Sequence, residues 1–132
     1  MQTKNKVLLD TSALVALLKK EPGHEIVSNI IASSAVSSVN LSELIAVLNR
    51  LGVSENDIDE IITDLVPEII PFCENISIKT GKLSTLTQGY GLSLGDRACL
   101  ATGDYYQMNI YTADKIWAEL KNIISSNIVM IR

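Results

Sequence analysis

The segment KVLLDTSALVALL, residues 6–18, changes from a strand pattern to a helical pattern at one acidic residue. Lys6 to Leu9 is a short apolar run of the kind that forms a buried strand, and it ends at Asp10. The apolar residues that follow keep the spacing of one helix face: Ala13, Leu14, Leu17 and Leu18. We therefore predict a strand that leads directly into a helix, the repeating unit of an α/β fold.

The same alternation continues to the end of the sequence. It predicts a strand over 35–39, a helix capped by Asn40 and ended by Gly52, a helix capped by Ser54, an extended piece at 69–70, helices over 75–88 and 93–102, a strand over 109–112, a helical segment over 115–122 and a strand over 128–131. This order predicts an α/β fold with a mainly parallel sheet of about four to five strands and helices on both faces. Because no repeat or linker interrupts it, we predict a single domain over residues 1–132.

The composition excludes several classes of protein. With 47% hydrophobic and 20% charged residues, the chain is too apolar for a disordered tail. Its longest clean apolar run, Ala13 to Leu18, is too short for a membrane span or a secretory signal, so we expect a cytoplasmic protein without membrane contact. Fifteen acidic against eleven basic residues give a net charge of −4, which argues against a generally basic nucleic-acid-binding surface.

Acidic residues mark the places where strands give way to helices. In an open parallel sheet the functional crevice lies at the carboxyl ends of the strands. Four acids, each at the end of a predicted strand or in the first turn of a predicted helix, could line that crevice: Asp10, Glu43, Asp96 and Asp114. We expect the fold to bring these four side chains to one edge of the sheet.

Helix capping alone could explain any one of these acids, because a carboxylate in the first turn of a helix stabilises it by about 0.3 to 1 kcal/mol. Asp114 is itself a plausible N-cap. Each of the other three, however, stands near a residue that could cap instead: Ser12 near Asp10, Asn40 before Glu43 and Ser93 before Asp96. We therefore predict that hydroxyl and amide groups supply these caps and leave the carboxylates for another role.

Carboxylates that converge in one crevice repel one another unless cations lie between them. Hard oxygen ligands suit Mg²⁺, with Mn²⁺ as the alternative. Hydrolysis of a phosphodiester needs such a site, since one ion lowers the pKa of a bound water and a second stabilises the leaving oxygen. The four acids therefore predict a hydrolase that depends on Mg²⁺ or Mn²⁺.

Four motifs in this order resemble those of the PIN-domain ribonucleases, and in particular of the VapC toxins of bacterial toxin–antitoxin pairs. They are LLDTSAL at 8–14, NLSE at 40–43, GLSLGDRACL at 91–100 and TADKIW at 112–117, and the third is the most specific. The resemblance runs from end to end of the chain. It implies a three-layer α/β/α PIN-like fold, a metal-dependent endoribonuclease that leaves 5′-phosphate and 3′-hydroxyl ends, a homodimer, and inhibition by a cognate VapB antitoxin.

The resemblance also assigns roles by position. The implied catalytic and metal-binding acids are Asp10, Glu43, Asp96 and Asp114, supported by the hydroxyl groups of Ser12 and Thr112. The sequence departs from the family pattern at Lys115, where arginine is frequent, and at residues 103–107, where the family is usually more apolar. The second departure leaves the identity of the RNA substrate open.

RNA contacts would have to come from basic residues near the acidic edge, because the net charge gives no general attraction. The candidates are Lys19, Lys20, Arg50 and, closest to the acidic motifs, Arg97 and Lys115. Trp117 could stack on a base, but its place one turn beyond Asp114 favours packing against the sheet.

Other functions compete with this interpretation. A stand-alone PIN-domain nuclease that processes RNA would carry the same four acids. A phosphotransferase could use Asp10 as a covalent nucleophile, but phosphatases of that type need a second acid where this chain has Ser12. A non-catalytic module could use the acids only to hold basic peptides, and metal affinity together with RNA cleavage would separate it from a nuclease.

Overall fold

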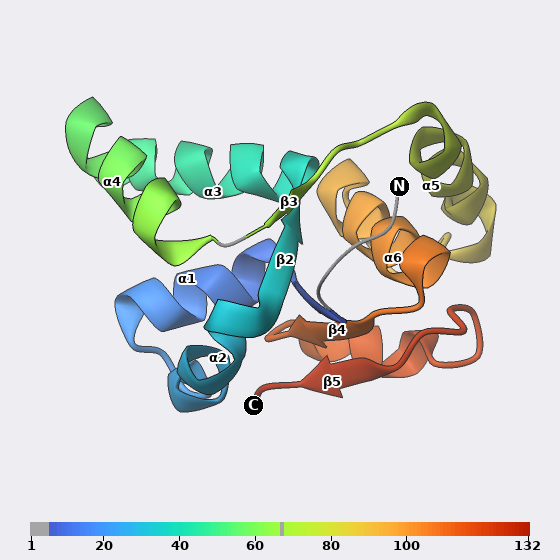
Figure 1. The fold of residues 1–132 in the computed structure, drawn as a ribbon. Coiled ribbons are helices and arrows are strands. Elements are labelled where there is room, and N and C mark those ends of the chain that lie inside the picture. The colour runs from blue at the N-terminus through green and yellow to red at the C-terminus, as the bar shows by residue number, and fades with distance from the viewer. Residues whose placement is uncertain (1–5, 67) are drawn as a thin grey trace.

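Five short strands form one sheet that carries helices on both faces (Figure 1). The computed structural model describes residues 6–66 and 68–132. In chain order the elements are β1 (Val7–Leu9), α1 (Thr11–Lys19), α2 (His24–Ile30), the 3-10 helix η1 (Ile31–Ser33), β2 (Ser34–Ser37), α3 (Ser38–Arg50), α4 (Glu55–Leu65), β3 (Ile69–Ile70), α5 (Glu74–Leu86), α6 (Leu94–Tyr106), β4 (Asn109–Thr112), the 3-10 helix η2 (Lys115–Leu120) and β5 (Ile128–Met130).

The sheet has the order β3-β2-β1-β4-β5, and all its pairs are parallel. Leu8 of β1 lies opposite Ala35 of β2 on one side and Ile110 of β4 on the other. The chain first runs outward from β1 to β3 and then returns to the other side of β1 as β4. Because the direction of winding reverses between β1 and β4, a crevice is expected at their carboxyl ends. The predicted parallel sheet is confirmed.

Alternate side chains of the strands enter two separate hydrophobic layers. Leu8 belongs to the layer formed with α5, α6 and η2, whereas Leu9 belongs to the layer formed with α1, α2, α3 and α4. This alternation is what a strand buried on both faces requires. It confirms the predicted three-layer α/β/α fold. Trp117 of η2 is fully buried in the first layer, as its predicted packing against the sheet requires.

The start of α3 differs from the prediction. Asn40 does not cap this helix, which begins at Ser38 after the N-cap Ser37, whose hydroxyl accepts a hydrogen bond from the backbone N–H of Val39. Strand β2 accordingly ends at Ser37 rather than at Val39. A serine that ends a strand can cap the next helix without any intervening loop, and a run of apolar residues on both sides hides that boundary.

Residues 103–106 continue α6 to its end at Tyr106, beyond the predicted end at Thr102, and Gln107 is the C-cap. Asp104 in this turn pairs with Lys79 of α5 at 2.8 Å and accepts hydrogen bonds from the backbone N–H groups of Ser125 and Ser126. The polar segment therefore ties α6 to α5 and to the turn that leads into β5.

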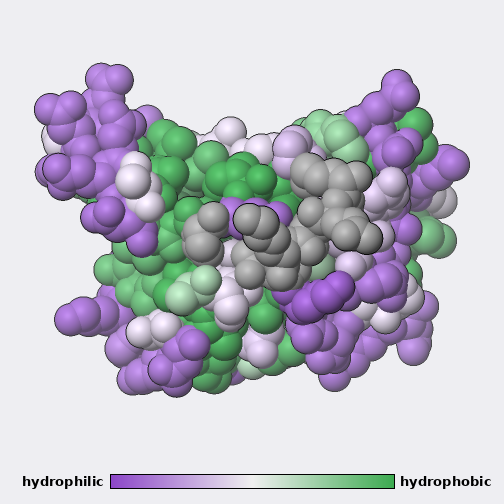
Figure 2. All heavy atoms as spheres, viewed as in Figure 1, coloured by the Kyte–Doolittle hydropathy of each residue, from purple (hydrophilic) through white to green (hydrophobic). Residues whose placement is uncertain are grey.

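The acidic residues of α4 form a solvated face. Asp57, Asp59, Glu60 and Asp64 are exposed, while Ile58 is buried. Hydrophilic residues cover the corner of the molecule where Figure 1 shows α4 (Figure 2). No helix of the described part of the chain is long and apolar enough to cross a membrane.

Candidate active site

One pocket of about 470 Å³ is lined by all four of the acids that the sequence singled out. Asp10 follows β1 directly, and Asp114 lies two residues beyond the end of β4. Glu43 lies in the second turn of α3, and Asp96 in the first turn of α6. Residues far apart in the sequence thus meet at the carboxyl edge of the two central strands. Thr11, Ser12, Glu21, Arg50 and Arg132 also line this pocket.

Asp10 is the most buried of the four acids, with 4% of its surface exposed. Its Oδ1 accepts a hydrogen bond of 2.8 Å from the backbone N–H of Ala13, and its Oδ2 accepts one of 2.5 Å from the Thr112 hydroxyl. The Ser12 hydroxyl lies 2.8 and 2.9 Å from the two oxygens and donates to this carboxylate as well. Three donors therefore occupy three of the roughly four acceptor positions of a carboxylate, which leaves one position for a further ligand.

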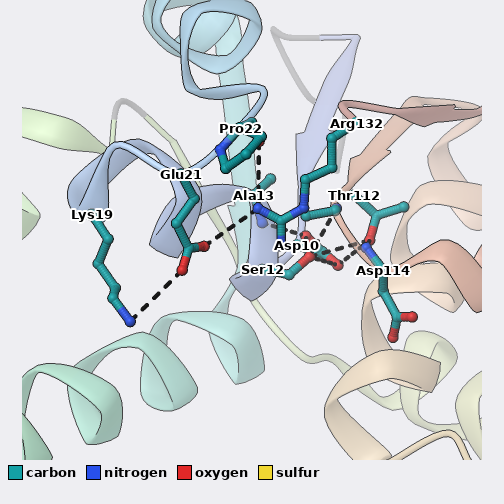
Figure 3. Close-up of polar contacts among 10 residues, drawn as sticks. Asp10, Ser12, Ala13, Lys19, Glu21, Pro22, Thr112, Asp114 and Arg132 are labelled. Atoms are coloured by element: carbon teal, nitrogen blue, oxygen red, sulfur yellow. Dashed lines mark hydrogen bonds and ion pairs between the residues drawn. The ribbon is translucent and has the colours of Figure 1, made fainter.

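Ser12 of α1 and Thr112 of β4 also connect Asp10 to the segment that follows β4. The Ser12 hydroxyl accepts from the backbone N–H of Ala113, and the Thr112 hydroxyl accepts from that of Asp114. Each hydroxyl thus donates a hydrogen bond to the Asp10 carboxylate and accepts one from a backbone N–H of residues 113–114, which follow β4 (Figure 3). The supporting role that the resemblance implies for both residues stays a prediction, and these hydrogen bonds are the contacts through which they would act.

Glu43 is fixed through one of its two carboxylate oxygens. Oε1 accepts hydrogen bonds from the Thr11 hydroxyl at 2.6 Å and from the side-chain amide of Asn40 at 2.8 Å. The other oxygen lies above Gly95 at the start of α6, where a Cβ atom would sit only 2.0 Å from Oε2. Any side chain at position 95 would therefore push Glu43 out of its present place.

Asp96 and Asp114 each accept a hydrogen bond at a helix N-terminus through one of their two carboxylate oxygens. Oδ2 of Asp96 accepts from the backbone N–H of Ser93 in a capping box, and Oδ1 of Asp114 accepts from the backbone N–H of Ile116. In residues 6–66 and 68–132, no protein donor contacts the other oxygen of either side chain. Oε2 of Glu43 likewise has no donor among the described residues, so three acids that line the pocket each have one carboxylate oxygen available.

The prediction that another residue supplies the helix cap is wrong for Asp10, whereas the Ser93 hydroxyl caps α6 as predicted and Asp114 is the N-cap that the sequence allowed. The side chain of Asp10 is the N-cap of α1, that of Asp114 is the N-cap of η2, and Asp96 completes the capping box of α6. A carboxylate has two oxygens, so it can satisfy a helix N-terminus with one and face the pocket with the other.

Burial and mutual repulsion raise the pKa of two of these acids. Burial raises the pKa of Asp10 to about 6, despite the opposing hydrogen bonds from Thr112, Ala13 and Ser12. Burial also raises the pKa of Asp96 above its ordinary value; hydrogen bonds from Ser93 oppose the shift, and the charges of Asp114 and Glu43 add to it. A bound cation would relieve both effects, because it favours the charged form of each carboxylate.

The donor set fits a hydrated divalent ion rather than a protein cage. No three acidic, imidazole or thiol side chains of the described residues are arranged to enclose one ion. Mg²⁺ does not require such a cage, since it usually binds one or two carboxylates and keeps several waters for substrate phosphate. Oε2 of Glu43 and the available oxygens of Asp96 and Asp114, with the remaining position on Asp10, provide ligands of that kind.

The basic residues of the pocket are Arg50 and Arg132 among those described. Arg50 was one of the candidates for RNA contact, whereas Arg132 was not. The other candidates lie outside this lining. The Nη1 group of Arg97 donates to the carbonyl of Leu92, and Lys115 is exposed beside Asp114.

Sequence reasoning also missed Thr11, Glu21 and Gly95. The position of Arg132 could have been found from topology, because it follows the last strand as Asp114 follows β4. In the parallel register Thr112 lies opposite Met130, which places the residues two positions further on at the same edge. Gly95 carries no chemical group, so only the structure shows that Glu43 needs the space above it.

Comparison with protein families gives a match to the PIN domain over residues 7–123. Among curated protein sequences, none matches this chain.

Several solved structures share the fold at low sequence identity. DNA-bound VapBC from Salmonella typhimurium matches with a TM-score of 0.74 and 16% identity, covering 97% of this chain and 99% of that one. A toxin–antitoxin complex from Klebsiella pneumoniae matches with a TM-score of 0.71 and 19% identity, covering 96% and 98%. The sarcin–ricin loop cleaving toxin VapC20 from Mycobacterium tuberculosis matches with a TM-score of 0.69 and 18% identity, covering 86% and 94%.

Proposed function

The chain belongs to the PIN domain family, and from that premise we propose that it is a metal-dependent endoribonuclease that acts as the toxin of a toxin–antitoxin pair. Its reaction would be hydrolysis of RNA phosphodiester bonds to 5′-phosphate and 3′-hydroxyl ends. The observation that carries this proposal is the single pocket lined by Asp10, Glu43, Asp96 and Asp114. The similarity to VapC20, whose described activity is cleavage of the sarcin–ricin loop, supports RNA as the substrate.

In this proposal, some carboxylate oxygens of the pocket accept hydrogen bonds that fix the side chain, and the others are available to a metal ion. Hydrogen bonds from Thr11 and Asn40 hold Glu43 through Oε1, and among the described residues Oε2 has no protein donor. Ser12 and Thr112 hold Asp10 between the ends of β1 and β4. Mg²⁺ or Mn²⁺, when bound by these carboxylates, would supply an activated water and stabilise negative charge on the leaving oxygen. The protein would hold the acids in fixed positions throughout the reaction. Little energy is then needed to reorient groups of the site as charge develops in the transition state.

A partner and a homodimer belong to the same proposal. The similar structures from Salmonella typhimurium and Klebsiella pneumoniae are toxin–antitoxin complexes, and this supports an antitoxin of the VapB type as the inhibitor of this chain. The expected arrangement in cells is a homodimer of this chain whose pockets the antitoxin blocks.

The first experiment measures cleavage of a mixture of structured RNAs by the purified chain. We expect cleavage with Mg²⁺ or Mn²⁺, none in EDTA, and 5′-phosphate ends on the products. Asp10→Asn and Asp114→Asn should each lower the rate by at least about a hundred-fold, in line with the loss of a charged group that acts in the transition state.

Asp59→Asn is the matched control, because Asp59 is an exposed carboxylate on α4 that lies outside the pocket. Its activity should equal that of the unchanged chain. Equal cleavage in EDTA, or an Asp10→Asn variant that is folded and fully active, would contradict the proposal. Growth arrest on expression of the unchanged chain, and none with Asp114→Asn, would separate a toxin from an RNA-processing nuclease.

A further inference from the structure

Arg132 lines the same pocket as the four acids. It follows β5 through Ile131, which is buried and donates its backbone N–H to the carbonyl of Thr112 at 3.0 Å. That bond extends the β4–β5 pairing past the end of the strand. The backbone of Arg132 is therefore fixed beside the segment that carries Asp114.

A second set of contacts fixes the same stretch from the connection between α1 and α2, residues 20–23. Gly23 lies so close to Ile131 that a Cβ atom on the glycine would sit 2.4 Å from the Ile131 carbonyl oxygen. The Nη1 group of Arg132 reaches the carbonyl of Pro22 at 3.4 Å and Oε1 of Glu21 at 3.5 Å. Figure 3 draws the guanidinium beside the Glu21 carboxylate, whose other oxygen lies 3.7 Å from Nζ of Lys19.

These contacts hold Arg132 loosely and leave most of its donors unused. Both involve Nη1 at distances near the upper limit of a hydrogen bond. For Nη2 and Nε, the described residues provide no acceptor. The side chain is one-third exposed, so these donors are open to a ligand that enters the pocket.

The charge of the pocket creates the need for such a group. RNA is an anion, and five carboxylates line the pocket against the cations Arg50 and Arg132. Arg50 ends α3 and is exposed, and no contact in the described structure orients it. Arg132, in contrast, is positioned by its place after β5 and by the contact of its guanidinium group with Glu21. The planar guanidinium group matches two oxygens of a phosphate, which a single ammonium group cannot do.

We propose that Arg132 binds a phosphate of the RNA backbone in the acidic pocket, and that Glu21 is the positioning residue for its guanidinium group. The proposal rests on the ribonuclease function proposed above and names a residue that the family motifs do not contain. Contact with a phosphate fixes the position of the RNA strand but gives no preference for its sequence.

The test compares Arg132→Ala, Arg132→Lys and Glu21→Gln with Lys121→Ala, which removes the same charge from an exposed position outside the pocket. Cleavage kinetics give KM and kcat. Fluorescence anisotropy with a labelled stem–loop RNA gives the affinity and its salt dependence, measured in Asp96→Asn protein so that the RNA stays intact.

We expect Arg132→Ala to raise KM and the dissociation constant about ten-fold, with a smaller change in kcat. The slope of log affinity against log salt should fall by about 0.7 for the one lost phosphate contact. Arg132→Lys should recover the slope but only part of the affinity. Glu21→Gln should show a smaller rise in KM, and Lys121→Ala should match the unchanged chain.

Failure of this inference differs from failure of the ribonuclease proposal. If the chain cleaves RNA but Arg132→Ala and Lys121→Ala give the same KM and salt slope, only the role of Arg132 is refuted. If RNA is bound through Arg132 but never cleaved, only the catalytic proposal is refuted. A chain that binds no RNA refutes both.

Discussion

Replacing Asp10 with asparagine is expected to stabilise the metal-free protein at neutral pH while removing its activity. Burial raises the pKa of Asp10 from 3.8 to about 6, although Thr112, Ala13 and Ser12 donate hydrogen bonds to it, and the charge of Asp96 adds to the rise. The folded protein therefore holds this proton more tightly than the unfolded chain does. Above pH 6 the carboxylate is ionised in both states, and its burial then lowers the free energy of unfolding.

The size of this effect follows from the shift. Each pKa unit corresponds to 1.36 kcal/mol, so a rise from 3.8 to about 6 lowers the stability by about 3 kcal/mol at pH 7.5 and by about half of that at pH 5. Below pH 3.8 both states are protonated and the effect disappears. Asparagine keeps the acceptor for Ala13 but loses the ideal partner of the Thr112 hydroxyl, at a cost of about 1 kcal/mol. The expected net gain at pH 7.5 is about 2 kcal/mol.

Equilibrium unfolding in urea measures this difference. The unchanged chain, Asp10→Asn and the exposed control Asp59→Asn are compared in EDTA at pH 7.5 and pH 4.5. Asp10→Asn should have the higher free energy of unfolding at pH 7.5 and lose most of the advantage at pH 4.5, whereas Asp59→Asn should show neither change. Added Mg²⁺ should narrow the gap at pH 7.5, because only the unchanged chain gains stability from a bound ion. A variant that is less stable at pH 7.5, or whose gain does not depend on pH, would refute the reasoning.

Three further predictions concern the supports of the pocket and of α6. Gly95→Ala places a methyl group on Glu43 and should lower the cleavage rate at least about ten-fold with an unchanged circular dichroism spectrum; full activity would show that the carboxylate can move without loss. Thr112→Val should lower the free energy of unfolding by about 1–3 kcal/mol, and Thr112→Ser, which keeps the hydroxyl, by less than half as much. Asp104→Ala should cost about 1–2 kcal/mol at pH 7 without affecting cleavage. Burial opposes a low pKa for Asp104, but contacts with Lys79 and Ser125 lower the pKa below its ordinary value. The stability cost of Asp104→Ala should therefore shrink as the pH falls below 3.8. A cost that stays constant from about pH 7 to about pH 3 would contradict this explanation.

The two central strands, β1 and β4, and their carboxyl ends could be predicted because the hydrophobic pattern decides them. Val7 to Leu9 are apolar in succession because a central parallel strand is buried on both faces, and Asp10 marks where that burial gives way to the crevice. The strand at Asn109–Thr112 was predicted with the bounds that the structure gives. Such strands are recognisable because the same run of apolar residues favours both strand formation and burial in the core.

Positions set by contacts between distant segments could not be predicted in this way. Ser37 rather than Asn40 caps α3, because Asn40 is turned into the structure, where its amide donates to Glu43 and to the carbonyl of Gly95. An asparagine near a helix start looks the same in sequence whether it caps the helix or supports a neighbour. Arg132 likewise lacks any motif, and only the register of β5 against β4 brings it to the pocket.

The capping acids show why a structural and a chemical role need not compete for one side chain. A helix N-terminus places unpaired N–H groups and a partial positive charge next to the first carboxylate, which favours its ionised form. Oδ2 of Asp96 and Oδ1 of Asp114 accept hydrogen bonds from such N–H groups, and among the described residues no protein donor contacts the second oxygen of either side chain. The pKa of Asp96 is nevertheless raised by burial and by its acidic neighbours, so the caps alone do not balance the repulsion. The remaining imbalance is the reason to expect that a divalent cation stabilises this fold as well as its reaction, and that EDTA lowers the melting temperature of the unchanged chain more than that of Asp10→Asn.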